Sequence, residues 1–171
     1  MTGWLKSLWL PLLMLLFILL STLPFIISCS SEPSPEATLR LFVDSIVQKN
    51  WETTWDLLSY QSQKMFEEQV LNPIKLKFKT TPQEARSLKH PQLGVSVQDL
   101  LDMSAKDFFI LNMQKTDMRD TFLKILNPDN LKVEKVKVEG NIAKIKLKGR
   151  AQEISLVREQ GKWRIVLFEM K

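Results

Sequence analysis

The chain has 171 residues, with 24 Lys and Arg against 19 Asp and Glu, and a formal net charge of +5. Its single histidine, His90, and single cysteine, Cys29, cannot together form a structural zinc site or an intrachain disulfide. None of the five glycines belongs to a phosphate-binding loop, so we expect no metal and no cofactor. The mild positive charge favours an anionic partner, and we expect that this partner is not nucleic acid.

The N-terminal segment is an apolar run, residues 8–20, that follows Lys6 and leads to small residues. This order of charge, apolar run and small residues is typical of a secretory signal. The run ends in Ile26-Ile27-Ser28-Cys29, which resembles, position by position, the lipobox of bacterial lipoprotein signals. The resemblance implies cleavage between Ser28 and Cys29 and lipidation of Cys29. Residues 1–28 are then a signal peptide, and the mature chain is anchored in the bacterial cell envelope, facing the periplasm or the exterior.

Three other interpretations of this segment remain open. The apolar run has about 20 residues, enough to span a bilayer as an uncleaved anchor. Cys29 could also be a buried thiol, or it could form an intermolecular disulfide. The Ser, Pro and Glu residues around it argue against burial, because such a composition does not build a core. We adopt lipidation of Cys29 as the leading hypothesis, since several acyl chains on one cysteine hold a protein firmly at a membrane.

After a Ser/Pro-rich tether, residues 29–35, we expect one α+β domain spanning residues 36–171. Apolar residues at helical spacing predict an amphipathic helix over residues 36–49. Asn50 is predicted to end it and to cap a short helix that carries Trp51 and Trp55. Ser59 then precedes a third helix, which carries Met65, Phe66 and Val70.

At Asn72-Pro73 the chain is predicted to change from helix to strand. Asn72-Pro73 should end the third helix, because the residue before proline disfavours the helical region. Residues 74–79 alternate apolar and Lys side chains, which predicts a short half-buried strand. Residues 80–94 contain two prolines and a glycine and are predicted to form a surface segment with a helical turn at 83–89.

Two capping signatures follow, Ser96 with Asp99 and Ser104 with Asp107, and each predicts the start of a helix. A further helix is predicted up to Leu126, before a turn at residues 127–130. We therefore interpret residues 80–126 as a helical insertion in the domain.

The C-terminal part predicts a four-stranded antiparallel meander. Gly140-Asn141, Gly149-Arg150 and Gln160-Gly161 separate runs rich in β-branched residues, as two-residue hairpin loops do. This register places only apolar residues in two cross-strand rows. The rows are Val136, Ile145, Ile154 and Leu167, and Val138, Ala143, Leu156 and Ile165.

The opposite face of the predicted meander is rich in lysine. The same register sets Lys135 opposite Lys146 and Lys137 opposite Lys144. One interpretation is an ordinary solvated face, since exposed charges contribute little. The other is a patch that contacts anionic lipid or a cell-wall polymer, aided by the lipid anchor.

The order of these elements resembles the nuclear transport factor 2-like, cystatin-like α+β cone. The resemblance lies in the helices bearing Phe42, Val43 and Ile46, in Trp51-x-x-x-Trp55, and in the closing hairpin Gln-Gly-Lys-Trp-Arg-Ile at 160–165. It implies a pocket between helices and sheet, for which Trp51, Trp55 and Tyr60 are candidate lining residues. The alternative is that the two tryptophans belong to the core and that Tyr60 packs at a helix end. The stretch 80–126 departs from the compact pattern, and its helices could fill or cover the concave side of the sheet.

Some members of this superfamily are isomerases, dehydratases or epoxide hydrolases, but the residues here predict no enzyme. Such chemistry needs a carboxylate or histidine inside the cone, and the apolar rows contain no titratable residue. His90 precedes Pro91 in a predicted loop. The leading hypothesis is a non-enzymatic envelope protein that binds a protein, a cell-wall component or a small apolar molecule. A carrier of an apolar or lipid ligand in the cone is the alternative, and an enzyme ranks third.

Overall fold

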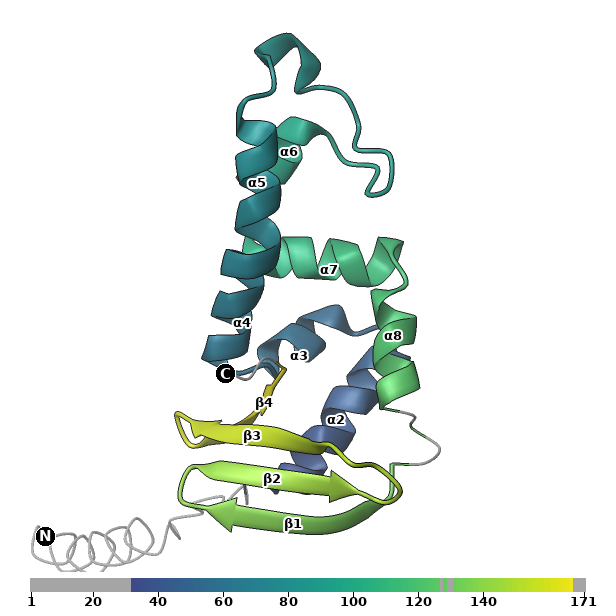
Figure 1. Cartoon of the computed structure of the whole chain (residues 1–171), viewed down its shortest axis with the longest axis vertical. Coiled ribbons are helices and arrows are strands. Elements are labelled where there is room, and N and C mark those ends of the chain that lie inside the picture. Colours follow the sequence, from purple (N-terminus) through teal and green to yellow (C-terminus); the bar gives the residue numbers. More distant parts are fainter. Residues whose placement is uncertain (1–31, 127, 129–130, 168–171) are drawn as a thin grey trace, which may run out of the picture. The chain divides into compact units, whose positions relative to one another are not determined.

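The computed structural model describes residues 32–126, 128 and 131–167. The chain divides into two compact units, Met1–Glu32 and Pro33–Lys171, and the described helices and strands lie in the second. The predicted signal, Ser28 and Cys29 therefore lie outside the described residues, as does most of the predicted turn at 127–130. Within the second unit, helices precede a C-terminal four-stranded antiparallel sheet, so the predicted α+β class is confirmed (Figure 1).

The elements follow the chain in a simple order of helices and then strands. The helices are α2 (Pro35–Val47), α3 (Trp51–Asp56), α4 (Tyr60–Phe66), the π turn η1 (Glu67–Leu71), α5 (Asn72–Lys79), the 3-10 turn η2 (Gln83–Ala85), α6 (Val97–Asp102), α7 (Ala105–Lys115) and α8 (Met118–Ile125). The strands are β1 (Val133–Glu139), β2 (Ile142–Leu147), β3 (Glu153–Glu159) and β4 (Lys162–Val166).

The first helix, α2, forms where the apolar spacing predicts it. The Ser34 hydroxyl accepts a hydrogen bond from the Ala37 N–H, and proline occupies the first helical position, where its missing N–H costs nothing. The helix stops before Lys49, which has a left-handed φ of 60°. The side chain of Asn50 then caps α3, as predicted.

Residues 74–79 are helical, so the predicted strand is wrong. Leu71, Ile74 and Phe78 are spaced by three and four residues, and this spacing places them on one face of a helix that packs on the core. Leu76, the third apolar member of the alternation, is 70% exposed. The alternating pattern therefore belongs to a helix with one exposed leucine. It resembled a strand because residues four apart, such as Ile74 and Phe78, share a face in both structures.

The helix also does not end at Asn72-Pro73, contrary to the prediction. The π turn η1 joins α4 to α5, so helical structure runs from Tyr60 to Lys79, and the two helices follow one line in Figure 1. Proline lacks an N–H and crowds the carbonyl four residues before it. The wider π turn lies just before Pro73 and accommodates both defects.

Both predicted capping signatures are confirmed. Ser96 and Asp99 form a reciprocal capping box at the start of α6. The Ser104 hydroxyl accepts from the Asp107 N–H at 3.1 Å at the start of α7. Short helices such as α6 depend on these contacts, because few of their backbone groups are paired within the helix.

The sheet has the strand order β1-β2-β3-β4, and the pairs that join its strands have the predicted register. Leu167, the predicted partner of Ile154, lies beyond the end of β4. Val136 pairs with Ile145, and Ala143 pairs with Leu156. Leu156 in turn pairs with Ile165, which fixes the third hairpin. The β3–β4 loop has positive φ at both Gln160 and Gly161, the geometry that two-residue hairpin loops require.

The core lies between one face of the sheet and α2. Leu39, Phe42 and Ile46 of α2 are fully buried, together with Ile145 and Ile165 of the sheet. Helix α8 packs on α2, where the rings of Phe42 and Phe122 meet edge to face at 6.2 Å. At the outer edge, Val136 and Val138 of β1 remain 36% and 52% exposed, although they belong to the same apolar rows.

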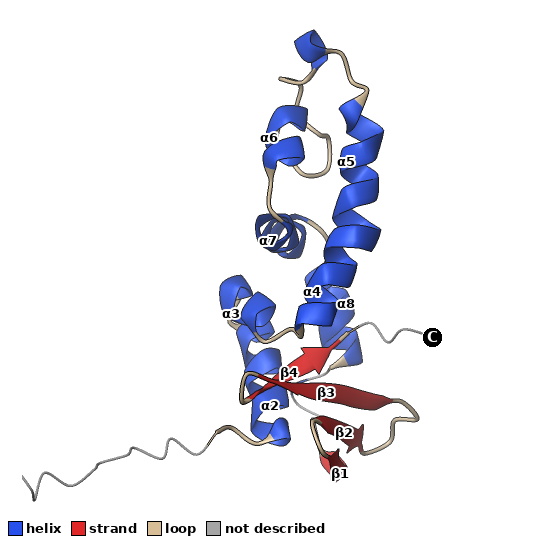
Figure 2. Cartoon of the chain, turned by 90° about the vertical axis from the view of Figure 1, so that its left-hand side faces the viewer, coloured by secondary structure: helices blue, strands red, loops and turns tan. Residues whose placement is uncertain are grey.

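The end of this unit farthest from the sheet is formed by α5, residues 80–96 and α6, as both views show (Figure 2). We call residues 72–102 the arm. Its segment 80–96 contains the 3-10 turn η2, within the predicted helical turn, and an isolated bridge between Lys89 and Ser96.

Candidate functional site

The structure does not bring the predicted pocket residues Trp51, Trp55 and Tyr60 together around a cavity. Both tryptophans are 7% exposed and belong to the hydrophobic core. The ring of Trp55 lies 5.3 Å from that of Phe109 and 5.9 Å from that of Phe66. Tyr60 is 68% exposed at the start of α4. The two tryptophans therefore stabilise the fold, and the tyrosine lies on its surface.

The carboxylates near Tyr60 already have structural partners. The Tyr60 N–H donates to the Glu159 carboxylate at 3.0 Å, so Glu159 caps the N-terminus of α4. Asp56 forms an ion pair with Lys106 at 3.2 Å, and its carbonyl accepts a hydrogen bond from Arg164. These contacts tie α3 and α4 to α7 and to the sheet.

A cavity of about 700 Å³ lies between α8 and the β2–β4 part of the sheet. We call it the cone-mouth cavity. Polar groups enter its lining from the β2–β3 connection, where Arg150 donates to the Lys124 carbonyl at 3.3 Å. Its apolar walls are Phe122, Ile125, Leu126, Leu147, Ile154, Ile165, Val166 and Leu167. Helix α8, which belongs to the predicted helical insertion, thus forms one wall of this cavity.

The lysine-rich face of the sheet exists with the predicted pairs, Lys135 opposite Lys146 and Lys137 opposite Lys144. Glutamates are interspersed among these lysines. Lys137 pairs with Glu139 at 2.6 Å, and Lys146 pairs with Glu134 at 3.5 Å.

One of these ion pairs shifts the titration of its members. The hydrogen bond and the charge of Lys137 lower the pKa of the Glu139 carboxyl, and Glu139 raises the pKa of Lys137 for the same reasons. Glu153 adds a third carboxylate opposite Lys146. The face is therefore a mixed surface, and its positive charge is largely compensated.

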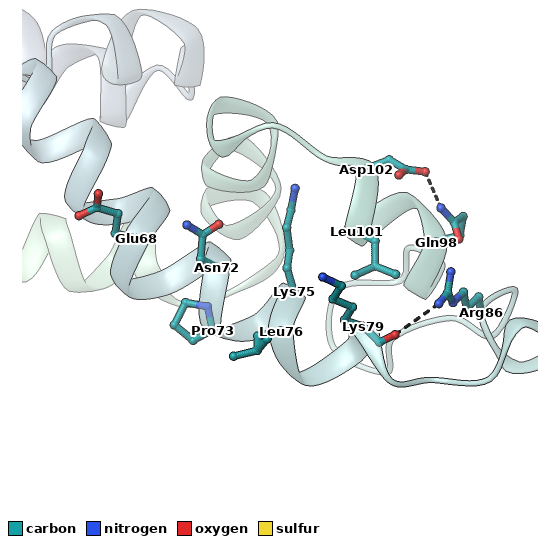
Figure 3. A pocket seen from close by; sticks show the side chains of 10 residues that line it. All are labelled: Glu68, Asn72, Pro73, Lys75, Leu76, Lys79, Arg86, Gln98, Leu101 and Asp102. Carbon is teal, nitrogen blue, oxygen red and sulfur yellow. Dashed lines mark hydrogen bonds between the residues drawn. The ribbon is translucent and has the colours of Figure 1, made fainter.

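A second cavity, of about 750 Å³, lies in the arm between α5 and α6, and we call it the arm cleft (Figure 3). Helix α5 contributes basic side chains, the segment after it contributes Arg86, and α6 contributes a leucine and two polar side chains. Its lining residues are Glu68, Asn72, Pro73, Lys75, Leu76, Lys79, Arg86, Gln98, Leu101 and Asp102.

Two of the three cations in the arm cleft are held in place by backbone carbonyls. Lys75 Nζ donates to the Met103 carbonyl at 2.7 Å and thereby bridges α5 and α6. Arg86 donates from Nε to the Thr81 carbonyl at 3.1 Å and from Nη2 to the Lys79 carbonyl at 3.3 Å. Because the acceptors are neutral, both side chains keep their full positive charge.

The arm contains five basic and three acidic residues, and two of the acidic ones, Asp99 and Asp102, lie at its end, so its first part is basic. A larger basic excess lies in residues 132–150, with seven basic against two acidic residues. Residues 72–98 contain one acidic residue, Glu84, whereas residues 29–71 contain seven acidic and three basic residues. This cleft was not predicted from the sequence, although its basic residues lie in the segments predicted to be a strand and a surface loop. The basic residues of these segments are Lys75, Lys77, Lys79, Arg86 and Lys89.

The described part of the chain is thus a mixed α+β domain with an apolar cavity beside its sheet and a basic cleft in its arm. In the ranges 32–126, 128 and 131–167, no cluster of His, Cys, Asp or Glu is arranged to hold a metal ion. Within the same ranges, no helix combines the length and apolar character needed to cross a membrane. Comparisons with protein-family models, curated proteins and solved structures found no match to this chain.

Proposed function

We propose that this chain is a lipid-anchored protein of the bacterial cell envelope with a non-enzymatic binding role. The observation that carries the proposal is the lipobox-like sequence Ile26-Ile27-Ser28-Cys29, placed directly before a folded unit. Five peptide units join Cys29 to Ser34, the cap of α2, and an extended chain of that length spans about 18 Å. A lipidated Cys29 would hold the domain close to the membrane surface.

The character of the interior supports binding rather than catalysis. The buried polar side chains of the described residues carry only hydroxyl groups, and several bond to one another, as Ser45 does to Thr54 at 2.8 Å. Such hydroxyl groups form hydrogen bonds with backbone groups inside the core. General acid or base catalysis instead needs a titratable group that faces the substrate from a protected position.

The mass of the anchored protein tests the first part of this proposal. We expect the protein extracted from bacterial membranes to lack residues 1–28 and to carry acyl chains on Cys29. A Cys29→Ala variant should retain residues 1–28 and carry no acyl chain. An intact mass corresponding to the full-length, unmodified chain in the wild type would overturn the lipid anchor in favour of an uncleaved segment.

The cone-mouth cavity favours a second candidate function, a carrier of a small apolar or lipid ligand. Its volume of about 700 Å³ and its apolar walls match the usual size and chemistry of such sites. Ile154→Trp should fill the cavity and abolish the fluorescence increase of cis-parinaric acid. Val157→Trp, a matched change elsewhere on β3, should leave the signal unchanged. Equal signals in the wild type and Ile154→Trp would exclude the carrier function.

A further inference from the structure

We infer that the arm cleft is a docking site for an acidic, amphipathic peptide segment of a partner protein. The inference goes beyond the proposed function, because it concerns the distal arm and holds whether or not Cys29 is lipidated. It rests on three observations: the charge of the cleft, its exposed apolar surface, and the fixed geometry of its cations.

The charge of the cleft identifies the sign of the ligand. Lys75, Lys79 and Arg86 line one cavity with two carboxylates, Glu68 and Asp102, so cations exceed anions by one. Glu68 lies 3.7 Å from Lys64, outside the lining, and Asp102 accepts a hydrogen bond from Gln98 at 2.7 Å (Figure 3). In the described part of the chain, no hydrogen bond or ion pair engages the Lys79 ammonium. Carboxylates of a partner would meet complementary charge here, which contributes to specificity and to the rate of association.

The apolar surface identifies the ligand as amphipathic. Leu76 is 70% exposed and lies on α5 between the two lysines of the cleft, and Leu101 lines the cleft from α6. A side chain as apolar as leucine gains free energy when a partner removes it from water. Lys75 and Lys79 are separated by one helical turn. A peptide with acidic residues one turn apart, and apolar residues between them, matches both features.

The geometry favours a peptide over a lipid surface. Lys75 and Arg86 are only partly exposed and are fixed by the carbonyls of Met103, Thr81 and Lys79, so little side-chain freedom is lost when a ligand binds. A flat layer of headgroups would meet the exposed α5 residues, whereas a peptide can lie along the cleft between α5 and α6 and contact the partly buried Arg86 as well.

A binding experiment on the full chain tests the inference. The chain is reconstituted in phosphatidylcholine nanodiscs, which accept either a lipidated or an uncleaved protein. It is then titrated with a fluorescein-labelled peptide of about four helical turns that carries Glu and Leu at the stated spacing. We expect saturable binding that weakens with salt, above the signal of empty nanodiscs. The same peptide with Lys in place of Glu should not bind.

Substitutions locate the binding within the arm. Lys75→Gln, Lys79→Gln and Arg86→Gln together should raise the Kd about tenfold or more. A matched control removes three charges from the sheet, with Lys135→Gln, Lys144→Gln and Lys148→Gln, and should leave the Kd unchanged.

A second variant is needed because Lys75 and Arg86 also hold the arm together, so the triple variant could lose binding through misfolding. Lys79→Glu with Leu76→Ser changes only exposed side chains and should weaken binding of the Glu/Leu peptide to the same extent. The inference is overturned if no peptide binds or if the sheet control weakens binding as much as the arm variants. It is also overturned if the arm variants instead lose binding to phosphatidylglycerol vesicles with no effect on the peptide.

Discussion

Ser45 and Thr54 join α2 to α3 inside the core through their side chains. The Ser45 hydroxyl donates to the Phe42 carbonyl at 2.7 Å, and Thr54 Oγ1 donates to the Asn50 carbonyl at 2.9 Å. The two hydroxyl oxygens lie 2.8 Å apart. The two hydroxyl hydrogens are therefore shared among three contacts, one to each carbonyl and one between the hydroxyl groups. Both residues are buried, and loss of one hydroxyl leaves the other with an incomplete set of partners.

Ser45→Ala should therefore lower the free energy of unfolding by about 1–2 kcal/mol, the usual cost of a lost buried hydrogen bond. Thr54→Val, which keeps the shape, should cost about the same. Because the residues share one contact, the double variant should lose less than the sum of the two. Urea unfolding followed by circular dichroism measures all three, with the exposed Gln48→Ala as control. Strict additivity would contradict a shared contact.

The Lys137–Glu139 pair gives a prediction about pH. The hydrogen bond from Lys137 lowers the pKa of Glu139, so any stabilisation from this carboxylate is present above its ordinary pKa and is lost as pH falls through the lowered value. Lys137→Gln should raise the pKa of Glu139 toward its ordinary value, as measured by NMR titration of the carboxyl carbon. Lys135→Gln should have a smaller effect, since Glu139 bonds to Lys137.

At the scale of elements, α6 is short and depends on its N-terminal cap. Ser96→Ala removes the acceptor of the Asp99 N–H at 3.0 Å and should cost about 1 kcal/mol. We expect faster amide hydrogen exchange in residues 97–102 than in the wild type. Ser96→Asn, which retains a capping side chain, should restore slow exchange. Acceleration spread equally over β2 and β3 would show that the cap acts on the whole domain instead.

The sheet was predictable in detail because its signals are local. Two-residue loops and a side-chain period of two leave one register for the first two hairpins that aligns apolar residues, since a shift by one residue would set Val136 against Lys144 or Lys146. The third hairpin was not fixed by this test, because Val166 and Phe168 flank Leu167. The bulge between Val133 and Lys135 was not predictable from this rule. The bulge adds one residue to β1 in the middle of a pairing, and no loop or glycine in the sequence indicates its position.

The helix α5 was not predictable by the same rule. Over six residues, the strand period and the helix period both place Ile74 and Phe78 on one face, and only Leu76 distinguishes them. Leu71, buried on the same face, resolves the ambiguity once the preceding turn is known to be a π turn. The proline rule also failed, because it states a preference for the residue before proline, and Asn72 adopts helical dihedrals in spite of Pro73.

At the scale of the whole molecule, the arm and the sheet should differ in stability. Helix α5 has no fully buried side chain, whereas the rows of β2 and β3 include Ile145 and Leu156, which are fully buried. Elements with little buried apolar surface open at low free-energy cost. Hydrogen exchange should therefore be fastest over 80–96, slower in α5 and slowest in β2 and β3. Equal protection of the arm and the sheet would contradict this order.

The arm cleft escaped prediction because it arises from contacts between distant parts of the chain. Lys75 and Met103 are 28 residues apart, and no periodicity links them. The cone-mouth cavity lies beside α8 and the sheet, away from Trp51, Trp55 and Tyr60. The resemblance to the cone family implied a pocket near Trp51 and Trp55, but the ring of Trp55 packs against Phe66 and Phe109, and both tryptophans belong to the core.

The exposed edge strand β1 bears on solubility. Val136 and Val138 offer apolar surface beside the unpaired side of an outer strand, a combination that promotes pairing with other chains. Lys135 and Lys137 alternate with these valines, and the bulge after Val133 interrupts the regular spacing of backbone groups. The lysines and the bulge both oppose pairing of β1 with the edge strand of another molecule. If Cys29 is lipidated as proposed, molecules held on one membrane surface would meet edge to edge, and the lysines and the bulge of β1 would oppose their lasting association.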